Sequence, residues 1–177
     1  MPRLSKELLA QAKMLAIREP RRPKAASLRR SISASYYALF HYLIEECTRL
    51  TVGTAHSRVQ LRQFAGRAFV HGKMKSVCEE FTKPTPRSEL LQPFWARLRV
   101  HATPEIRTIA ENFIDLQGDR HAADYDLSRN FTRHDANTAA DQAKDAMDAW
   151  DVLKVQHEEV ALLFALSLML WPGLGVR

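Results

Sequence analysis

Residues 28–50 read LRRSISASYYALFHYLIEECTRL, and this stretch decides the fold. Its apolar side chains recur every three or four residues, which is the spacing that places them on one face of an α-helix. The stripe consists of Leu28, Ile32, Tyr36, Leu39, Phe40, Leu43, Cys47 and Leu50, with Tyr37 and Ile44 widening it. We predict a long helix that begins near Pro23 or Ala25, ends within residues 51–54 and forms the centre of the core.

A row of polar side chains runs beside this apolar stripe. Arg29, Ser33, Tyr37 and His41 recur every four residues, so they form a seam next to the core rather than on the far side of the helix. The hydroxyl groups of Ser33 and Tyr37 are therefore placed to satisfy a buried arginine or aspartate.

Charged residues interrupt a second apolar stripe. The stripe begins with Ile106, Ile109, Ala110, Phe113 and Leu116, and the same spacing continues through Gln117, Arg120, Ala123, Asp124 and Leu127. Thr103 and Pro104 are a favourable start for this helix, because a capping hydroxyl precedes a proline at the first helical position. Arg120 and Asp124 then face inward, which costs several kcal/mol unless they pair. A structural ion pair is the simplest interpretation, and a functional site is the alternative.

The rest of the chain also favours helices, because glycine is scarce and helix-forming residues dominate between scattered prolines. We expect helices over residues 4–18, 56–71, 73–81, 90–101, 132–153 and 156–170, the last ending at Trp171, Pro172 and Gly173. In the second of these, the predicted inner face is Val59, Leu61, Phe64 and Ala68. Residues 83–87 read as a rigid surface loop. The sequence therefore predicts an all-α fold, a single helical-bundle domain over residues 1–177 with about six to eight helices.

Cysteine usage and hydropathy bear on the compartment. Cys47 and Cys78 lie in helical patterns without a nearby ligand at metal spacing, which indicates buried, reduced thiols, with a disulfide as the less favoured alternative. Residues 160–171 (VALLFALSLMLW) are too few to cross a bilayer and suit a core helix or a subunit contact. We expect a cytoplasmic protein without a membrane span.

Charge is distributed unevenly around a formal net charge of +6. Residues 1–30 carry nine Lys and Arg against two acidic residues, and residues 49–107 carry eleven against four. Residues 135–177 are acidic, with seven acidic residues against three basic ones. This asymmetry favours a basic surface that faces phosphate or an acidic partner, and a solvated charged face is the alternative.

Several enzyme classes are disfavoured by missing motifs. The sequence contains no glycine-rich phosphate loop, no nucleophile elbow and no histidine pair at metal-ligand spacing. We therefore expect no cofactor and no metal.

Two motifs together resemble a bacterial branch of the HEPN superfamily. Residues 28–41 (LRRSISASYYALFH) resemble its RRAVSRAYYALFH helix, and residues 120–126 (RHAADYD) resemble its RHxADYD element, in the same order. Residues 69–78 (FVHGKMKSVC) and 131–134 (FTRH) look like two further segments of that branch, so the resemblance covers nearly all of the chain.

The resemblance implies a helical bundle, commonly a homodimer, in which the polar motif of each subunit faces its symmetry mate. Many members are metal-independent ribonucleases or toxins whose motif is an arginine, a polar residue, about three others and a histidine. Arg120 and His121 match the first two positions, and Tyr125 stands where the histidine is expected. Because an ordinary tyrosine with a pKa near 10 is a poor base and a weak acid, the resemblance favours binding over catalysis.

A second string, from Arg129 to His134, also matches the arginine-to-histidine spacing. With arginine this abundant, such pairs arise by chance. Thr132 reads as a helix N-cap that pairs with Asp135 in a capping box. A cap inside the string would interrupt the continuous helix that the motif requires.

The leading hypothesis is a HEPN-family homodimer that binds RNA or a nucleotidyltransferase-type antitoxin within a toxin–antitoxin or defence system. In it Arg120 neutralises a phosphate or orients a partner carboxylate, and Asp124 fixes Arg120 or Arg30. Tyrosine side chains donate hydrogen bonds or stack on a base. The predicted binding cluster comprises Arg29, Arg30, Ser33, Tyr36, Tyr37, His41 and Asp124.

Two alternatives remain open. One is a metal-independent endoribonuclease toxin, in which Arg120 stabilises the phosphate and a nearby group moves protons. The candidates for that group are His121, His41 and Tyr125. The other is a non-catalytic interaction module, in which the ion pair serves only to hold two helices in register.

Overall fold

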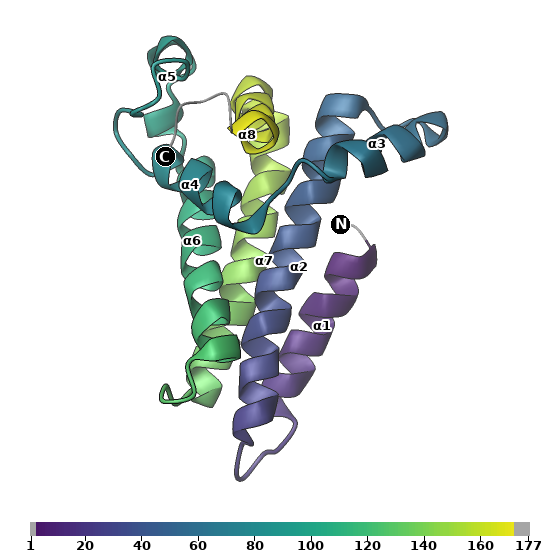
Figure 1. Cartoon of the computed structure of the whole chain (residues 1–177), viewed down its shortest axis with the longest axis vertical. Coiled ribbons are helices and arrows are strands. Elements are labelled where there is room, and N and C mark those ends of the chain that lie inside the picture. Colours follow the sequence, from purple (N-terminus) through teal and green to yellow (C-terminus); the bar gives the residue numbers. More distant parts are fainter. Residues whose placement is uncertain (1–2, 172–177) are drawn as a thin grey trace. The chain divides into compact units, whose positions relative to one another are not determined.

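The computed structural model describes residues 3–171, and every regular element in that range is a helix (Figure 1). The α-helices are α1 (Arg3–Ile17), α2 (Ala25–Val52), α3 (Val59–Gly66), α4 (His71–Phe81), α5 (Gln92–Arg97), α6 (Pro104–Tyr125), α7 (Arg133–Gln156) and α8 (Glu158–Leu170). Two short 3-10 helices, η1 (His56–Arg58) and η2 (Val100–Ala102), lie between them. The prediction of an all-α fold is confirmed. Between residues 3 and 171, no helix combines the length and the apolar character that crossing a membrane requires.

The helices pack as two compact units. The first unit contains the residues up to Tyr42 together with Asn112–Met147, and the second contains Leu43–Glu111 together with the residues from Asp148 onward. Helices α2, α6 and α7 each contribute to both units. The single domain predicted over the whole chain remains a prediction.

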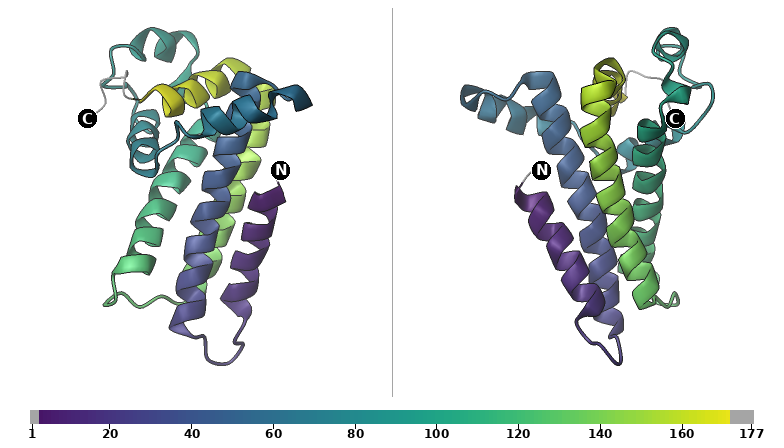
Figure 2. Two further views of the ribbon diagram at one scale, coloured as in Figure 1. Left: turned by 45° about the vertical axis from the view of Figure 1, so that its right-hand side comes forward. Right: turned by 180° about the vertical axis from the view of Figure 1, so that it is seen from behind.

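The first unit is built from α1 and from parts of α2, α6 and α7, which run side by side (Figure 2). Tyr36 and Phe113 are fully buried at its centre, with their ring centroids 5.6 Å apart. The faces of α1 and α7 toward this centre consist largely of alanine, which lets the helices approach closely. A hydrogen bond of 2.7 Å from the Ser31 hydroxyl to the Ala12 carbonyl ties α2 to α1. The predicted inward face of α2 is therefore confirmed in this unit.

The second unit has an aromatic core. The ring of Phe81 lies 4.9 Å from the rings of both Trp95 and Phe164, so α4, α5 and α8 meet there. Cys47 and Cys78 are buried free thiols, as predicted. Burial raises the pKa of the Cys78 thiol well above its ordinary value, which keeps it protonated and unreactive.

The loop between α4 and α5 is anchored by a buried carboxylate. Glu80 is only 1% exposed and accepts hydrogen bonds from the Lys83 ammonium and the Arg87 backbone amide. The Trp95 indole nitrogen donates a hydrogen bond of 3.0 Å to the Pro84 carbonyl. These bonds explain why a proline-rich segment of irregular backbone keeps a fixed path.

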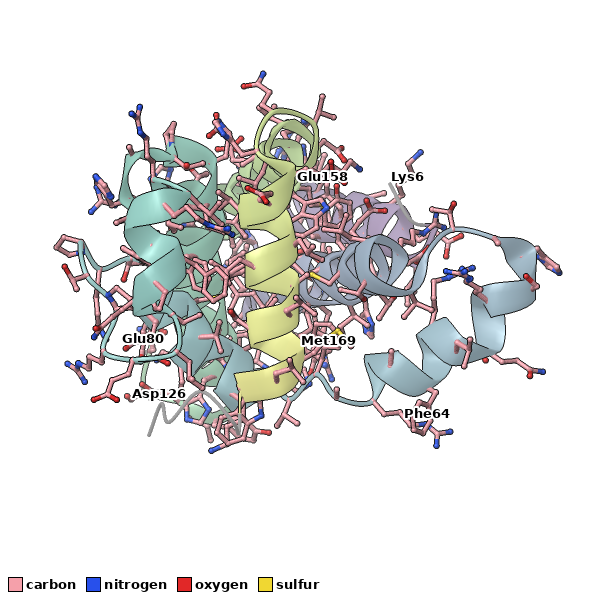
Figure 3. The ribbon with its side chains drawn as sticks, turned by 90° about the horizontal axis from the view of Figure 1, so that it is seen from above. Lys6, Phe64, Glu80, Asp126, Glu158 and Met169 are labelled. Atoms are coloured by element: carbon pink, nitrogen blue, oxygen red, sulfur yellow. The ribbon has the colours of Figure 1, made fainter. Side chains whose placement is uncertain are left out.

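The predicted helix over residues 56–71 is wrong in two respects. It divides into η1 and α3, and two residues of its predicted inner face are exposed, Leu61 at 58% and Phe64 at 73%, while Val59 and Ala68 are half-buried. Figure 3 shows Phe64 projecting outward from α3. The reason is a close helix contact, because a Cβ placed on Gly66 would lie 3.3 Å from the Ile44 side chain. The face with the small residue therefore packs against α2, and Leu61 and Phe64 lie on another face.

Other predicted boundaries need two corrections. The helix predicted over residues 90–101 divides into α5 and η2, because Arg99 between them adopts a left-handed backbone conformation with a φ of 51°. Helix α6 begins at Pro104 as predicted but ends at Tyr125, and Leu127 is 89% exposed, so it does not continue the inward stripe. The Asp126 carboxylate accepts hydrogen bonds from the Ser128 amide and hydroxyl, which turns the chain immediately after the helix. The predicted end of the last helix at Pro172 and Gly173 lies outside the described residues.

Candidate functional site

An ion pair on α6 forms the centre of the candidate site. Arg120 and Asp124 lie one helical turn apart, and the Arg120 Nε atom is 3.0 Å from Asp124 Oδ2. Their side chains are 20% and 23% exposed. The predicted pairing is therefore present at the edge of the core, where each side chain keeps some access to solvent.

Two residues of the polar seam on α2 complete this pair. Arg120 Nη2 donates a hydrogen bond of 2.7 Å to the Tyr37 hydroxyl, and the Ser33 hydroxyl donates one of 2.6 Å to Asp124 Oδ1. Ser33 and Tyr37 are four residues apart on α2, and they pair with Asp124 and Arg120, which are four residues apart on α6. The order is reversed because the two helices are antiparallel. We call these four residues the α2–α6 ladder.

Arg29 serves the end of α6. Its guanidinium donates to the carbonyl oxygens of Ala123 and Asp126, both at 2.8 Å, and to that of Arg129 at 2.6 Å. The last carbonyls of a helix lack partners within the helix and carry partial negative charge, so a cation stabilises them. Arg29 therefore holds the end of α6 and the following turn, and its donors face the protein backbone rather than a ligand.

Aromatic rings surround the Arg120 guanidinium. Its central carbon lies 5.4 Å from the centre of the Tyr37 ring and 5.9 Å from the rings of Tyr36 and Tyr125. Tyr36 is fully buried, so it forms the floor under the arginine and cannot stack on a base. Tyr125 is 65% exposed, so its ring is accessible for stacking on a base.

The environment fixes the charge of Arg120. Burial lowers its pKa, but the hydrogen bond to Tyr37 and the charge of Asp124 outweigh this effect and raise the pKa above its ordinary value. Arg120 is therefore a permanent cation in a fixed position. Among residues 3–171, its Nη1 atom donates no hydrogen bond, and the side chain is 20% exposed, so this group can still contact a ligand.

The two candidate histidines lie at different positions around the ladder. His41 is half-buried and its ring stacks beside Tyr37, with centroids 6.2 Å apart; burial lowers its pKa. His121 is exposed and its ring centroid lies 5.0 Å from that of Tyr125. Within the described part of the chain, no hydrogen bond joins either histidine to Arg120, as the offset of about 100° between neighbouring helical residues predicts for His121.

A groove adjoins the ladder on the side of α1. It has a volume of about 410 Å³ and is lined by Leu8, Gln11, Leu15, Arg30, Ser33, Ala34 and Tyr37. We call it the α1–α2 groove. Arg30 is exposed, and its guanidinium has no hydrogen-bond or ion-pair partner among residues 3–171. Sequence spacing did not identify α1 as a wall of this groove, since Leu8 and Leu15 are spaced like ordinary core residues.

The second arginine-to-histidine string is not a continuous helix. Thr132 caps α7, since its hydroxyl oxygen accepts a hydrogen bond of 3.2 Å from the Asp135 amide, and the Thr132 amide donates one of 2.7 Å to the Asp135 carboxylate in return. Arg129 precedes this cap and pairs with Asp119 at 2.8 Å. The predicted interruption of the string is therefore confirmed.

Neither a metal site nor a relative among known proteins identifies this site. Among residues 3–171, no group of three or more His, Cys, Asp and Glu side chains is arranged to hold a metal ion. No family model, no curated protein and no solved structure matches the chain.

Proposed function

We propose that the chain is a HEPN-family protein that binds RNA through the α1–α2 groove and the α2–α6 ladder. The observation that carries the proposal is an unpartnered arginine, Arg30, in a groove whose wall includes Tyr37, the partner of Arg120. An arginine without an internal partner keeps its full charge for a phosphate, and Arg120 adds unused donors nearby. The excess of basic residues within residues 1–30 supports an anionic ligand.

Binding is favoured over catalysis by the groups around Arg120. Cleavage by the RNA 2′-hydroxyl needs one group that accepts a proton and one that donates it. Asp124 is already held by Arg120 and Ser33, and neither candidate histidine is hydrogen-bonded to the arginine. In this proposal Arg30 and Arg120 contact phosphate, while the exposed Tyr125 ring stacks on a base.

The family resemblance extends the proposal to partners. It implies a homodimer that works with a nucleotidyltransferase-type antitoxin in a bacterial toxin–antitoxin or defence system. The partly exposed ladder is then the surface that one subunit presents to the other, and the cell compartment is the cytoplasm.

A metal-independent endoribonuclease is the second candidate function. The observation in its favour is that Arg120 and His121 lie against the same ring, that of Tyr125, at 5.9 and 5.0 Å. A substrate bound over that ring would have a cation and an imidazole within reach of one phosphate. This function predicts RNA cleavage that persists in EDTA and disappears in Arg120→Ala.

The test is binding of a fluorescein-labelled RNA measured by fluorescence anisotropy over a series of salt concentrations. Arg30→Ala is expected to weaken binding about fivefold to tenfold and to reduce the salt dependence by about one phosphate contact. Arg22→Ala is the matched control, because Arg22 is also exposed and basic but does not line the groove. Equal affinity of wild type and Arg30→Ala would refute the proposed site. Sequencing of RNA ends after incubation in EDTA separates binding from cleavage.

A further inference from the structure

A second groove lies in the second unit, between the C-terminal part of α2 and α3. It has a volume of about 640 Å³ and is lined by Ile44, Glu45, Thr48, Arg49, Val59, Arg62, Gln63, Gly66 and Arg67. We call it the α2–α3 groove. Ile44, Val59 and Gly66 give it an apolar floor, and arginines lie along its rim. Helices α2 and α3 approach closely at one end of the groove, where a Cβ placed on Gly66 would lie 3.3 Å from the Ile44 side chain.

The segment around this groove is strongly basic. Residues 47–78 contain six Lys and Arg and no acidic residue. Arg62 donates to the carbonyl oxygens of Gly53 and Ala55, at 2.6 and 3.0 Å, which ties α3 to the end of α2. These bonds are to backbone carbonyls, so no carboxylate neutralises the charge of Arg62.

Arg67 is the free cation of the rim. It is exposed, and its guanidinium has no hydrogen bond or ion pair with any residue from 3 to 171. Arg49, by contrast, pairs with Glu45 at 2.7 Å. One rim arginine is thus internally compensated, while Arg62 and Arg67 are available to an anionic group.

Apolar side chains are exposed beside these arginines. Helix α3 has no buried residue, and its largest apolar side chains, Leu61 and Phe64, are 58% and 73% exposed. An apolar floor, two exposed apolar side chains and uncompensated arginines occur together within one short stretch. Such a combination is typical of a site that receives a ligand with both apolar and acidic groups.

We propose that the α2–α3 groove binds an acidic amphipathic helix of a partner protein. Apolar side chains of that helix pack on Ile44 and Val59 and against Phe64, and its carboxylates pair with Arg62 and Arg67. In a helix, residues three and four positions apart lie on the same face. A single helix can therefore present apolar side chains and carboxylates side by side to the groove.

The lining favours a peptide over RNA. The lining residues include no aromatic ring, so a base has nothing to stack on inside the groove, and the exposed Phe64 lies beside the groove rather than in its lining. Ile44 and Val59 contribute apolar side chains to the lining, and apolar side chains of a peptide can be buried against them, whereas the sugar–phosphate backbone of RNA offers no comparable apolar group. Residues 172–177 of the chain contain no acidic side chain, so they do not have the required charge.

This inference does not rest on the proposed function. The two grooves share no lining residue, and each lies within one unit. RNA binding at the α1–α2 groove can fail without affecting peptide binding at the α2–α3 groove, and the reverse also holds.

The test is a selection from a displayed library of random 16-residue peptides on the purified full-length chain. The selected peptides are expected to carry a net negative charge, with Leu, Ile or Phe at spacings of three and four residues. A synthetic, fluorescein-labelled copy of one of them is then titrated with wild type and variants. Arg67→Glu is expected to weaken its binding at least tenfold, and Val59→Asp to weaken it similarly.

Arg97→Glu is the matched control, since Arg97 is an exposed arginine of the same unit that does not line the groove. It should change the affinity less than twofold, and circular dichroism should show that all variants are folded. Neutral or basic selected peptides, or equal binding to wild type and Arg67→Glu, would overturn the proposal. It is also overturned if a labelled oligouridylate binds in an Arg67-dependent manner, or if Arg67→Glu abolishes self-association of the chain, because the occupant would then be RNA or a second copy.

Discussion

The Tyr37 hydroxyl accepts a hydrogen bond of 2.7 Å from Arg120, although 83 residues separate the two in the chain. With the Ser33 to Asp124 bond, it fixes the register of α2 against α6 at two levels one turn apart. A shift of either helix by one turn would separate both pairs and leave a half-buried arginine and aspartate without partners on α2. The ladder therefore selects one alignment of the two helices.

The ladder should behave as a coupled unit. Tyr37→Phe removes the acceptor but keeps the ring, and we expect it to lower the free energy of unfolding by about 1–2 kcal/mol. Ser33→Ala should act similarly through Asp124. Urea denaturation of the single and double variants measures the coupling, which we expect to exceed about 0.5 kcal/mol. Strictly additive effects would show that the two bonds act independently.

Arg29 should stabilise the end of α6 through its geometry as well as its charge. Arg29→Lys keeps the charge but loses the planar fork that reaches several carbonyls, so we expect a loss of about 1–2 kcal/mol, with a larger loss for Arg29→Ala. Hydrogen exchange should become faster in residues 122–129 and stay unchanged in α1. If the lysine variant is as stable as wild type, charge alone explains the effect.

His41 should make stability depend on pH. Burial lowers its pKa in the folded protein below the ordinary value of 6.5. Between the folded pKa and 6.5 the unfolded chain binds more protons at this position, so the free energy of unfolding falls as pH decreases through this window. Above about pH 7 the effect vanishes, because His41 is neutral in both states.

The measurement for His41 is the difference between the pH profiles of wild type and His41→Gln, from urea denaturation between pH 5 and 8. The variant should lose less stability on acidification. His134→Gln, at an exposed position in the first turn of α7, serves as the control. Parallel profiles for wild type and His41→Gln would contradict the prediction.

Glu80 should be the residue that keeps the loop between α4 and α5 in place. Burial raises its pKa, but the hydrogen bonds from Lys83 and from the amides of Arg87 and Ser88 outweigh this effect and lower it. Glu80→Gln removes the charged acceptor, and we expect a loss of about 1.5–3 kcal/mol together with faster proteolysis within residues 82–91.

Glu79→Gln is the matched control for that loop. Glu79 is the exposed neighbour of Glu80, and its carboxylate lies 4.0 Å from Lys75. A surface pair of this kind contributes less than about 1 kcal/mol. Comparable losses in the two variants would show that burial of Glu80 has no special role.

The sequence predicted the features that depend on local periodicity. The inward face of α2, the polar seam beside it and the capping box of Thr132 and Asp135 all follow from spacings within one helix. The pairing of Arg120 with Asp124 is likewise a relationship between residues one turn apart. These contacts need no knowledge of how the chain folds back on itself.

The features that the sequence could not predict depend on long-range contacts. Arg29 bonds to backbone carbonyls that lie 93 to 100 residues away, and carbonyls have no signature in a sequence. Leu61 and Phe64 are spaced like core residues, but the contact of Gly66 with Ile44 determines which face of α3 packs. The α1 wall of the first groove was missed for the same reason.

The α2–α6 ladder has a thermodynamic consequence. Tyr37 lines the α1–α2 groove and also accepts the hydrogen bond of Arg120, so a ligand group that donates a hydrogen bond to the Tyr37 oxygen competes with the bond that joins the two helices. Occupation of the groove and local opening of α6 are then linked equilibria, and by reciprocity each changes the other by the same factor. Ligand binding in the groove would therefore change the free energy of local unfolding of α6.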